Sequence, residues 1–186
     1  SIPPSVTELY VRNNNLKYVD ISGNKKITRL HIEDNPINVV RVPNQLKYIN
    51  ISGTKIDSLW NLMQTDIEEL IAERLVGNVG SRLSLVFLPS KLKILSIKNS
   101  NIVNNISNFP IGLEKLIMDN CDLSSANKFP LFVNFPKSLR FFSANGCGIQ
   151  EFGSFAECEN ISIVNLESNK LSCLLYTSDA ADDIRR

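Results

Sequence analysis

Five side chains in this sequence are of the types that most often bind metals or act as nucleophiles and bases: the four cysteines and the single histidine, His31. A structural zinc site uses four such ligands, commonly with two of them in a close CxxC pair. No CxxC occurs here, because Cys121, Cys147, Cys158 and Cys173 are well separated. A catalytic site needs a nucleophile, a base and an orienting group within reach of one another. We therefore expect no cofactor, no metal site and no enzymatic activity in this chain.

Two further features argue against other kinds of chemistry. The segment "GNVGSR" (77–82) has two glycines but neither the spacing nor the lysine of a phosphate-binding loop. We expect it to form an outer turn, and no small-molecule site is evident. His31 is flanked by Arg29 and Glu33 in an apolar-polar alternation that is typical of a strand. A lone histidine in that setting is expected to be a solvent-exposed surface residue and not a base.

The composition is that of an ordinary globular chain. Of its 186 residues 43% are hydrophobic and 21% are charged, and the formal net charge is +1. A near-neutral chain gives no electrostatic reason to expect nucleic acid or an anionic membrane as a partner. The longest apolar run, "LSLVFL" (83–88), is much shorter than the ~20 residues of a spanning helix, so we expect no membrane span in this chain.

The strongest signal in the sequence is an internal repeat. Seven segments fit the pattern L-x-x-L-x-L-x-x-N/C/T/S-x-L, and an eighth, residues 67–77, fits it more weakly. Successive copies begin 19 to 26 residues apart. The seven segments are VTELYVRNNNL (6–16), ITRLHIEDNPI (27–37), LKYINISGTKI (46–56), LKILSIKNSNI (92–102), LEKLIMDNCDL (113–123), LRFFSANGCGI (139–149) and ISIVNLESNKL (161–171).

This pattern resembles the leucine-rich repeat superfamily over residues 1–172. A proline recurs just before the repeats, as in "VPNQL" and "LPSKL", which is similar to the short repeats of bacterial effectors and some protist proteins. The resemblance implies an α/β fold: a right-handed leucine-rich repeat solenoid, or horseshoe, of about eight repeats. Its concave side would be a parallel β-sheet and its convex side mostly irregular or short-helical.

The physical chemistry of the repeat accounts for its columns. Alternating apolar residues direct one side of a short strand inward, and the residues that follow turn the chain. The small polar column then lies under the turn, where its side chains can bond to backbone groups that would otherwise be buried without a partner. Leu75 is the exception in this column. The expected ladder is Asn14, Asn35, Thr54, Ser100, Cys121, Cys147 and Asn169.

The ladder also predicts the state of the cysteines. Cys121 and Cys147 fall in the same column of adjacent repeats, so we expect buried free thiols and not a disulfide or a redox pair. Cys158 lies just before the last repeat and is expected to be half-buried. No targeting signal indicates a compartment, but free thiols favour an intracellular one.

The weak eighth repeat admits two interpretations. Residues 57–75 have apolar residues at helical spacing, which would suit a helical insertion. The step from Ile49 to Leu70 nevertheless matches the repeat period, which favours a degenerate repeat with a longer outer segment.

Three rows of side chains should point out of the predicted sheet. The first row is Glu8, Arg29, Tyr48, Glu69, Ile94, Lys115, Phe141 and Ile163. The second row is Tyr10, His31, Asn50, Ile71, Ser96, Ile117, Ser143 and Asn165. The third row is Arg12, Glu33, Ser52, Glu73, Lys98, Asp119, Asn145 and Glu167.

Two parts of these rows predict contact with a partner. The early repeats present Tyr10, His31 and Tyr48 among mixed charges. The later repeats present exposed apolar residues, and contiguous exposed apolar surface usually marks an interaction site. We expect Ile94, Ile117 and Phe141 to lie side by side and the third row to form a solvated rim. The apolar set is Ile71, Ile94, Ile117, Phe141 and Ile163.

The repeat stops at Cys173. The segment "CLLYTSDAADD" (173–183) resembles the in-frame translation of a common transposase sequencing adapter. We therefore expect residues 173–186 to be a non-native or disordered tail. The absence of an initiator Met and of a signal peptide further suggests that residues 1–172 are a piece of a longer protein, cut at both ends.

The resemblance implies a protein-protein interaction module that binds a protein or peptide ligand on its concave sheet. Two alternatives stay open at this point. The chain could be the recognition arm of a larger enzyme or receptor, such as a ubiquitin-ligase effector or a receptor kinase, or it could be a cell-surface adhesin.

Overall fold

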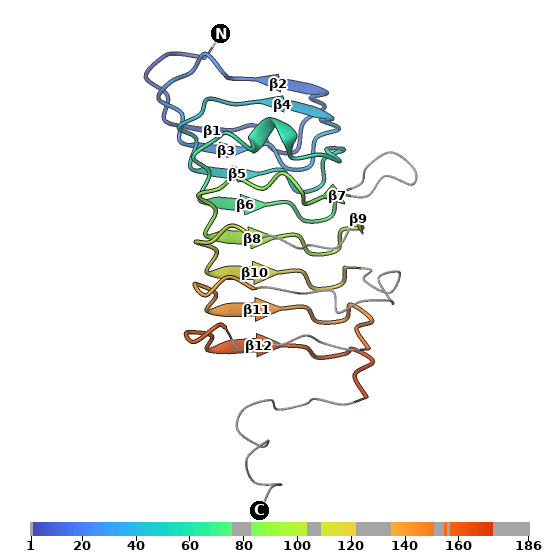
Figure 1. Ribbon diagram of the computed structural model, residues 1–186. Coiled ribbons are helices and arrows are strands. Elements are labelled where there is room, and N and C mark those ends of the chain that lie inside the picture. Colours follow the sequence, from blue (N-terminus) through green and yellow to red (C-terminus); the bar gives the residue numbers. More distant parts are fainter. Residues whose placement is uncertain are drawn as a thin grey trace, which may run out of the picture.

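The chain forms a parallel β-solenoid, in which each repeat is one coil that contributes one strand to a common sheet (Figure 1). The structure is a computed structural model, and it describes residues 2–75, 83–103, 109–121, 135–150, 155 and 157–172. Eight strands of three residues pair in the order β1 (Glu8–Tyr10), β3 (Arg29–His31), β5 (Tyr48–Asn50), β6 (Glu69–Ile71), β8 (Ile94–Ser96), β10 (Lys115–Ile117), β11 (Phe141–Ser143) and β12 (Ile163–Asn165).

All pairs in this sheet are parallel, and their register joins equivalent positions of the repeat. Leu9 pairs with Leu30, Leu70 with Leu95, and so on to Phe142 with Val164. The central residue of each strand points into the coil, while the residues before and after it point to solvent, because strand side chains alternate. The register predicted from the repeat is therefore confirmed.

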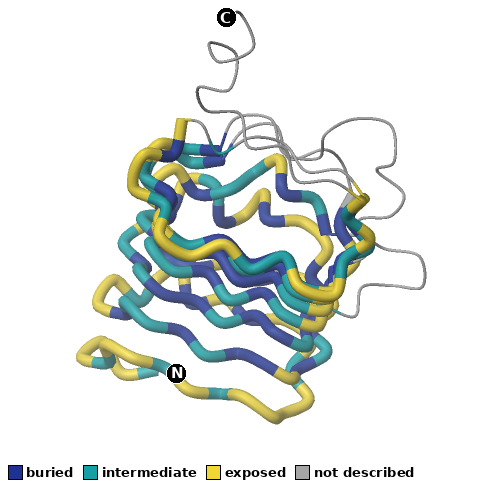
Figure 2. Tube along the Cα trace, turned by 90° about the horizontal axis from the view of Figure 1, so that it is seen from below, coloured by how far each residue is buried: buried dark blue, intermediate teal, exposed yellow. Residues whose placement is uncertain are grey.

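The opposite wall of the solenoid is less regular. It contains two small parallel sheets, one of β2 (Tyr18–Asp20) with β4 (Val39–Arg41) and one of β7 (Leu83–Ser84) with β9 (Ile102–Val103). The helical content of the described residues is one turn of 3-10 helix, η1 (Trp60–Leu62). Figure 2, which looks along the stack, shows the coils lying over one another.

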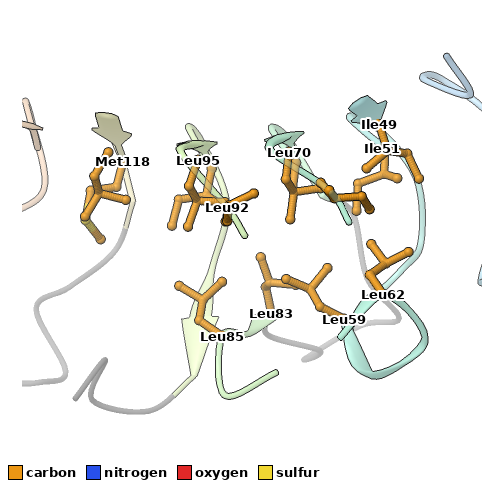
Figure 3. Close-up of a cluster of buried hydrophobic side chains, with 14 of the residues drawn as sticks. Ile49, Ile51, Leu59, Leu62, Leu70, Leu83, Leu85, Leu92, Leu95 and Met118 are labelled. Atoms are coloured by element: carbon orange, nitrogen blue, oxygen red, sulfur yellow. The ribbon is translucent and has the colours of Figure 1, made fainter. Parts of the chain in front are cut away.

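The core fills the space between the two walls. Figure 3 shows Leu70, Leu95 and other side chains of the large sheet facing Leu59, Leu62, Leu83 and Leu85 of the opposite wall. The inward residues of the inner strands are shielded completely: Leu30, Ile49, Leu70, Leu95, Leu116 and Phe142 each have 0% exposure. Burying a leucine-sized side chain contributes roughly 1.5–3 kcal/mol, so this column stabilises the fold substantially. At the last strand, Val164 is 42% exposed.

Residues 57–75 form a coil and not a helical insertion. Leu59 and Leu62 enter the core through the single turn of η1, and β6 then pairs with β5 and β8. The interpretation as a degenerate repeat is therefore correct. Its exceptional residue, Leu75, is half-buried, and its backbone N–H donates to Ser100 Oγ of the next coil at 3.2 Å.

A left-handed residue follows each strand of the large sheet and starts the turn. Its φ lies between +51° and +67° in all eight coils. Glycine and asparagine tolerate this conformation best, which explains most of the residue types found there. The eight residues are Asn13, Asp34, Gly53, Arg74, Asn99, Asn120, Gly146 and Ser168.

The expected ladder lies directly after these residues, and its side chains bond to the backbone. Asn35 Nδ2 donates to the carbonyls of Val11 and Ile32 at 2.9 and 3.1 Å, and its Oδ1 accepts from the N–H of Leu16 at 3.0 Å. Asn169 Nδ2 reaches the carbonyl of Ala144 at 2.8 Å in the same way. The bonds to Val11, Leu16 and Ala144 join consecutive coils, since the partners are 19 to 25 residues apart in the chain, whereas the bond to Ile32 lies within one coil.

The smaller ladder residues make fewer bonds of the same kind. Ser100 Oγ donates to the carbonyl of Ala72 at 3.1 Å, and the thiols of Cys121 and Cys147 donate to the carbonyls of the preceding coils at 3.0 Å each. Thr54 and Asn14 bond within their own coils, at 2.7 Å and 3.0 Å. Asn14 is exposed, whereas Thr54 is fully buried.

Candidate interaction surface

The solvent-facing side of the eight-stranded sheet carries all eight residues that the sequence predicts as partner contacts. We call this surface the sheet face. The strand pairs place the first and second rows as the repeat predicts, with Arg29 next to Tyr48 and His31 next to Asn50. The sheet face therefore runs from Glu8 on β1 to Ile163 on β12 as one surface.

The apolar residues do not form one continuous row, which corrects an expectation. Lys115 stands between Ile94 and Phe141 in the first row, and its Nζ lies 4.9 Å from the centroid of the Phe141 ring. In the second row, Ser96 separates Ile71 from Ile117. Apolar and polar side chains therefore alternate across this part of the sheet face.

The exposure of this apolar set is also lower than expected. Ile71, Ile94, Ile117 and Phe141 are half-buried, and only Ile163 is largely exposed, at 52%. Side chains on neighbouring strands stand about 5 Å apart, so each residue of an inner strand is shielded by one neighbour on each side. Ile163 is more open because it lies on β12, at the end of the strand order.

An aromatic stack occupies the other end of the sheet face. The Tyr10 and His31 rings are nearly parallel, at 14°, with centroids 4.4 Å apart. The Tyr48 ring lies against the second side of His31 at 4.7 Å, and the Arg29 guanidinium carbon lies 4.0 Å from the Tyr48 centroid. Tyr10 remains 57% exposed, while Tyr48 is buried. Four planar groups from three neighbouring strands thus lie against one another, with the Tyr48 ring tilted by 35° to that of His31.

His31 is therefore not the solvent-exposed residue that the sequence suggested. Its side chain retains 13% exposure because Tyr10 and Tyr48 cover it. The ring Nδ1 lies 3.4 Å from Glu33 Oε1. The ring Nε2 is buried and has no hydrogen-bond partner in the described structure.

The third row is not a uniform solvated rim either. Glu33 and Ser52 are buried, at 9% and 4% exposure, whereas Arg12 and Glu167 at the two ends are exposed. Glu33 Oε2 is a second buried atom without a partner in the described structure, and Asn145 Oδ1 is a third. The coils are stacked closely enough that inner residues of this row shield one another.

Two other carboxylates of the third row are satisfied by a serine of the next coil. Ser96 Oγ donates to Glu73 Oε1, and Ser143 Oγ donates to Asp119 Oδ1, each at 2.5 Å. The position equivalent to these serines beside Glu33 holds Asn50, whose Oδ1 accepts from the N–H of Ser52 at 3.0 Å. This arrangement leaves Glu33 without the donor that its counterparts have.

The tyrosines of the stack have raised pKa values. Tyr10 donates its hydroxyl to Glu8 Oε2 at 2.6 Å, and this hydrogen bond raises its pKa. Burial raises the pKa of Tyr48, and the nearby carboxylates of Glu69 and Glu33 raise it further. Both phenols therefore stay protonated at neutral pH and can donate hydrogen bonds.

The thiols do not form a reactive site. Cys121, Cys147 and Cys158 are free and buried, and burial raises the pKa of Cys121 to about 12 and that of Cys147 to about 11. Burial also raises the pKa of Cys158. Cys158 is thus more buried than the sequence suggested, while Cys173 and the adapter-like tail lie outside the described residues. In the described ranges no three side chains of His, Cys, Asp or Glu gather to hold a metal ion.

Neither the comparison with protein-family models nor the search of curated proteins gives a match for this chain. Across the described ranges, no helix has the length and apolar character needed to cross a membrane.

Proposed function

We propose that this chain is a protein-interaction module of the leucine-rich repeat type and that its sheet face is concave and binds an extended segment of a protein or peptide. The repeat pattern and the parallel sheet support the family assignment. Solenoids commonly use such a face for binding, because stacked repeats offer a long surface whose side chains vary while the fold does not.

The observation that carries the binding role is the set of partly exposed apolar and aromatic side chains on the sheet face. Ile71, Ile94, Ile117 and Phe141 are half-buried, while Ile163 and Tyr10 are 52% and 57% exposed. A partner that removes such side chains from water gains the free energy of their burial.

The dimensions suit a peptide ligand. Eight strands at about 4.8 Å each span roughly 35 to 40 Å, which matches an extended peptide of about ten residues that crosses the strands. Each strand presents outward residues before and after its central one, and the third row follows two residues beyond the strand, so a peptide that crosses the strands would run alongside these rows.

A selection from a random-peptide library, displayed on phage, tests this proposal. Peptides that bind the protein should lose affinity by about tenfold or more on Phe141→Ala, since central aromatic contacts often contribute about 2 kcal/mol. The matched control is Tyr18→Ala, an exposed aromatic residue of β2 on the opposite wall, which should leave binding unchanged. Peptides that ignore Phe141→Ala, Tyr10→Ala and Glu33→Gln but respond to Tyr18→Ala would refute the role of the sheet face.

A further inference from the structure

A single lysine stands among the apolar side chains of the sheet face. Lys115, on β10, pairs in register with Ile94 on β8 and with Phe141 on β11, and Ile117 follows on the same side of β10. It is the only cation among the outward residues of β6, β8, β10, β11 and β12, all of which lie in the described ranges. Lys115 and its three apolar neighbours are all half-buried, so its charge lies within the apolar part of the surface and not at its rim.

The charge of Lys115 is not neutralised by the part of the chain that the structure describes. Lys115 makes no ion pair there, and its Nζ lies 4.9 Å from the centroid of the Phe141 ring. Asp119 stands four residues further along the chain, past the end of β10. Its Oδ1 already accepts from Ser143 Oγ and from the N–H of Asn145.

The charged residues just before the strands show the opposite arrangement. Cations and carboxylates alternate there from coil to coil, and Glu68 lies 3.0 Å from Lys47 and 2.8 Å from Lys93. The hydrogen bond to Glu68 raises the pKa of Lys93, and the charge of Glu114 in the next coil raises it further. Lysines in that column are therefore matched by the chain itself, whereas Lys115 is left to be matched by a ligand.

A peptide that contacts both Ile94 and Phe141 has to pass over Lys115, because the three residues stand side by side on consecutive strands. Covering the ammonium group removes water from it, which is unfavourable unless a charged or polar group of the ligand takes the place of that water. A carboxylate does so with the right charge, while a second cation at the same place is repelled. The surface therefore selects for apolar and acidic groups at neighbouring positions of one ligand.

We propose that Lys115, with Ile94 and Phe141 on either side, binds an aspartate or glutamate side chain of the bound peptide. The carboxylate accepts a charge-assisted hydrogen bond from Lys115 Nζ, and apolar residues of the peptide cover the two flanking side chains. Side chains on one side of an extended peptide stand two positions apart, so apolar residues are expected two positions before and after the acidic one. This inference rests on the proposed function and names the class of ligand that this part of the sheet face selects.

Peptides selected from the phage library provide the probe. Those that depend on Phe141 should each contain an acidic residue that matters for binding. Replacing that residue in the synthetic peptide, glutamate by glutamine or aspartate by asparagine, should weaken binding about tenfold or more. Fluorescence anisotropy of the labelled peptides measures the affinities. The change is made in the peptide, so the result does not depend on whether a protein variant folds.

A charge reversal in the protein locates the contact. Lys115→Glu should weaken binding of the same peptides about tenfold or more, and a peptide whose acidic residue is replaced by lysine should regain most of that loss on this variant alone. Lys17→Glu is the matched control, because it makes the same change of net charge at an exposed position just before β2, on the opposite wall. The control should change the affinity less than about twofold, since screening weakens distant charges. If Lys115→Glu does not fold, Lys115→Gln provides the second test, with an expected loss of about three- to tenfold.

Three outcomes would overturn the subsite and leave the proposed function standing. Peptides could need Phe141 yet tolerate the loss of every acidic residue, which would mean that Lys115 turns its ammonium aside into water. Lys115→Glu and Lys17→Glu could have equal effects, or the peptides could need Tyr10 and not Phe141. The proposed function fails instead if the selected peptides respond to Tyr18→Ala and to no substitution on the sheet face, and the subsite then fails with it.

Discussion

Phe141 and Phe142 are neighbours in the chain and lie on opposite sides of the same sheet. Phe142 has 0% exposure and belongs to an inward column that is apolar in every coil, whereas Phe141 is half-buried on the sheet face. The row that contains Phe141 also holds glutamate, arginine, tyrosine, lysine and isoleucine. Packing restricts the inward side, and the outward side can vary in chemistry without loss of the fold, which is what a recognition surface requires.

The turn after each strand shows a different kind of restriction. The ladder column contains asparagine, threonine, serine and cysteine, so neither size nor hydrophobicity is constant. What Asn35, Ser100, Cys121, Cys147 and Asn169 share is a side chain that donates to a backbone carbonyl of the preceding coil. Hydrogen bonding therefore restricts the residue types in the ladder column, and packing restricts those at the inward strand position.

The largest effect is expected from substitution of the two phenylalanines. Phe142→Ala should destabilise the protein by about 3–5 kcal/mol, because it opens a cavity in the core. Phe141→Ala should cost less than about 1 kcal/mol, since its ring is half-buried against Lys115. Urea unfolding followed by circular dichroism measures both values. Equal losses would show that the two sides of the sheet do not differ in their contribution to stability.

The ladder provides the next test. Asn35→Ala should cost about 2–3 kcal/mol, because it leaves the carbonyls of Val11 and Ile32 and the N–H of Leu16 without their partner. Asn14→Ala is the matched control in the first coil, where the side chain is exposed and bonds only within its own coil. The control should lose less than about 1 kcal/mol. A similar loss in both variants would indicate that the bonds between coils do not account for the stability that the ladder contributes.

Glycine in the turn should matter where the backbone is left-handed. A Cβ at Gly53, whose φ is +65°, would lie 2.2 Å from Asp34 Oδ1, so Gly53→Ala combines backbone strain with displacement of that side chain. We expect a loss of about 1–2 kcal/mol. Gly23→Ala serves as the control, because a Cβ there meets nothing within 4 Å, and its change should stay near zero. Thermal unfolding of the two variants would distinguish them.

The buried thiols should have the smallest effect on stability, but their burial should clearly slow the rate at which they are labelled. The pKa of Cys121 is about 12 and that of Cys147 about 11, so at pH 8 the native protein holds far less thiolate than the unfolded chain, whose thiols titrate near 8.5 to 9. Iodoacetamide should label both residues roughly 100-fold or more slowly in the native state, because the thiolate is the nucleophile. Mass spectrometry of labelled peptides measures the rates in buffer and in urea.

The pH profile of this labelling has a definite sign. The native rate should keep rising above pH 9, since both thiols remain mostly protonated there, whereas the rate in urea should level off near that pH. The pKa values of both thiols are higher in the folded protein than in the unfolded chain, so their contribution to the free energy of unfolding is complete below about pH 8.5. This contribution declines as the pH rises through 9 toward 11–12. A native rate that levels near pH 9 would contradict the buried positions.

The sequence by itself determined the period, the strand register and the inward residues. Leu30, Leu70 and Phe142 could be assigned to the core from the repeat alone, because alternation along a strand decides which side a residue faces. It also indicated the ladder column, where a small polar side chain must bond to backbone groups of the turn that would otherwise be buried without a partner. The left-handed residues before the ladder could have been found from the same alignment, since Asn13, Asn99, Asn120, Gly53 and Gly146 recur at one column.

Only the tertiary structure decided how far each outward side chain is shielded and which groups it meets. His31 and Glu33 occupy positions that the repeat predicts as exposed, yet both are largely covered. The side chains that cover His31 are Tyr10 and Tyr48, which come from the coils before and after it. Repeat periodicity specifies which residues are adjacent, but the direction in which a long side chain leans depends on the size and charge of neighbours in other coils. The buried atoms without a partner, His31 Nε2 and Glu33 Oε2, arise from that packing.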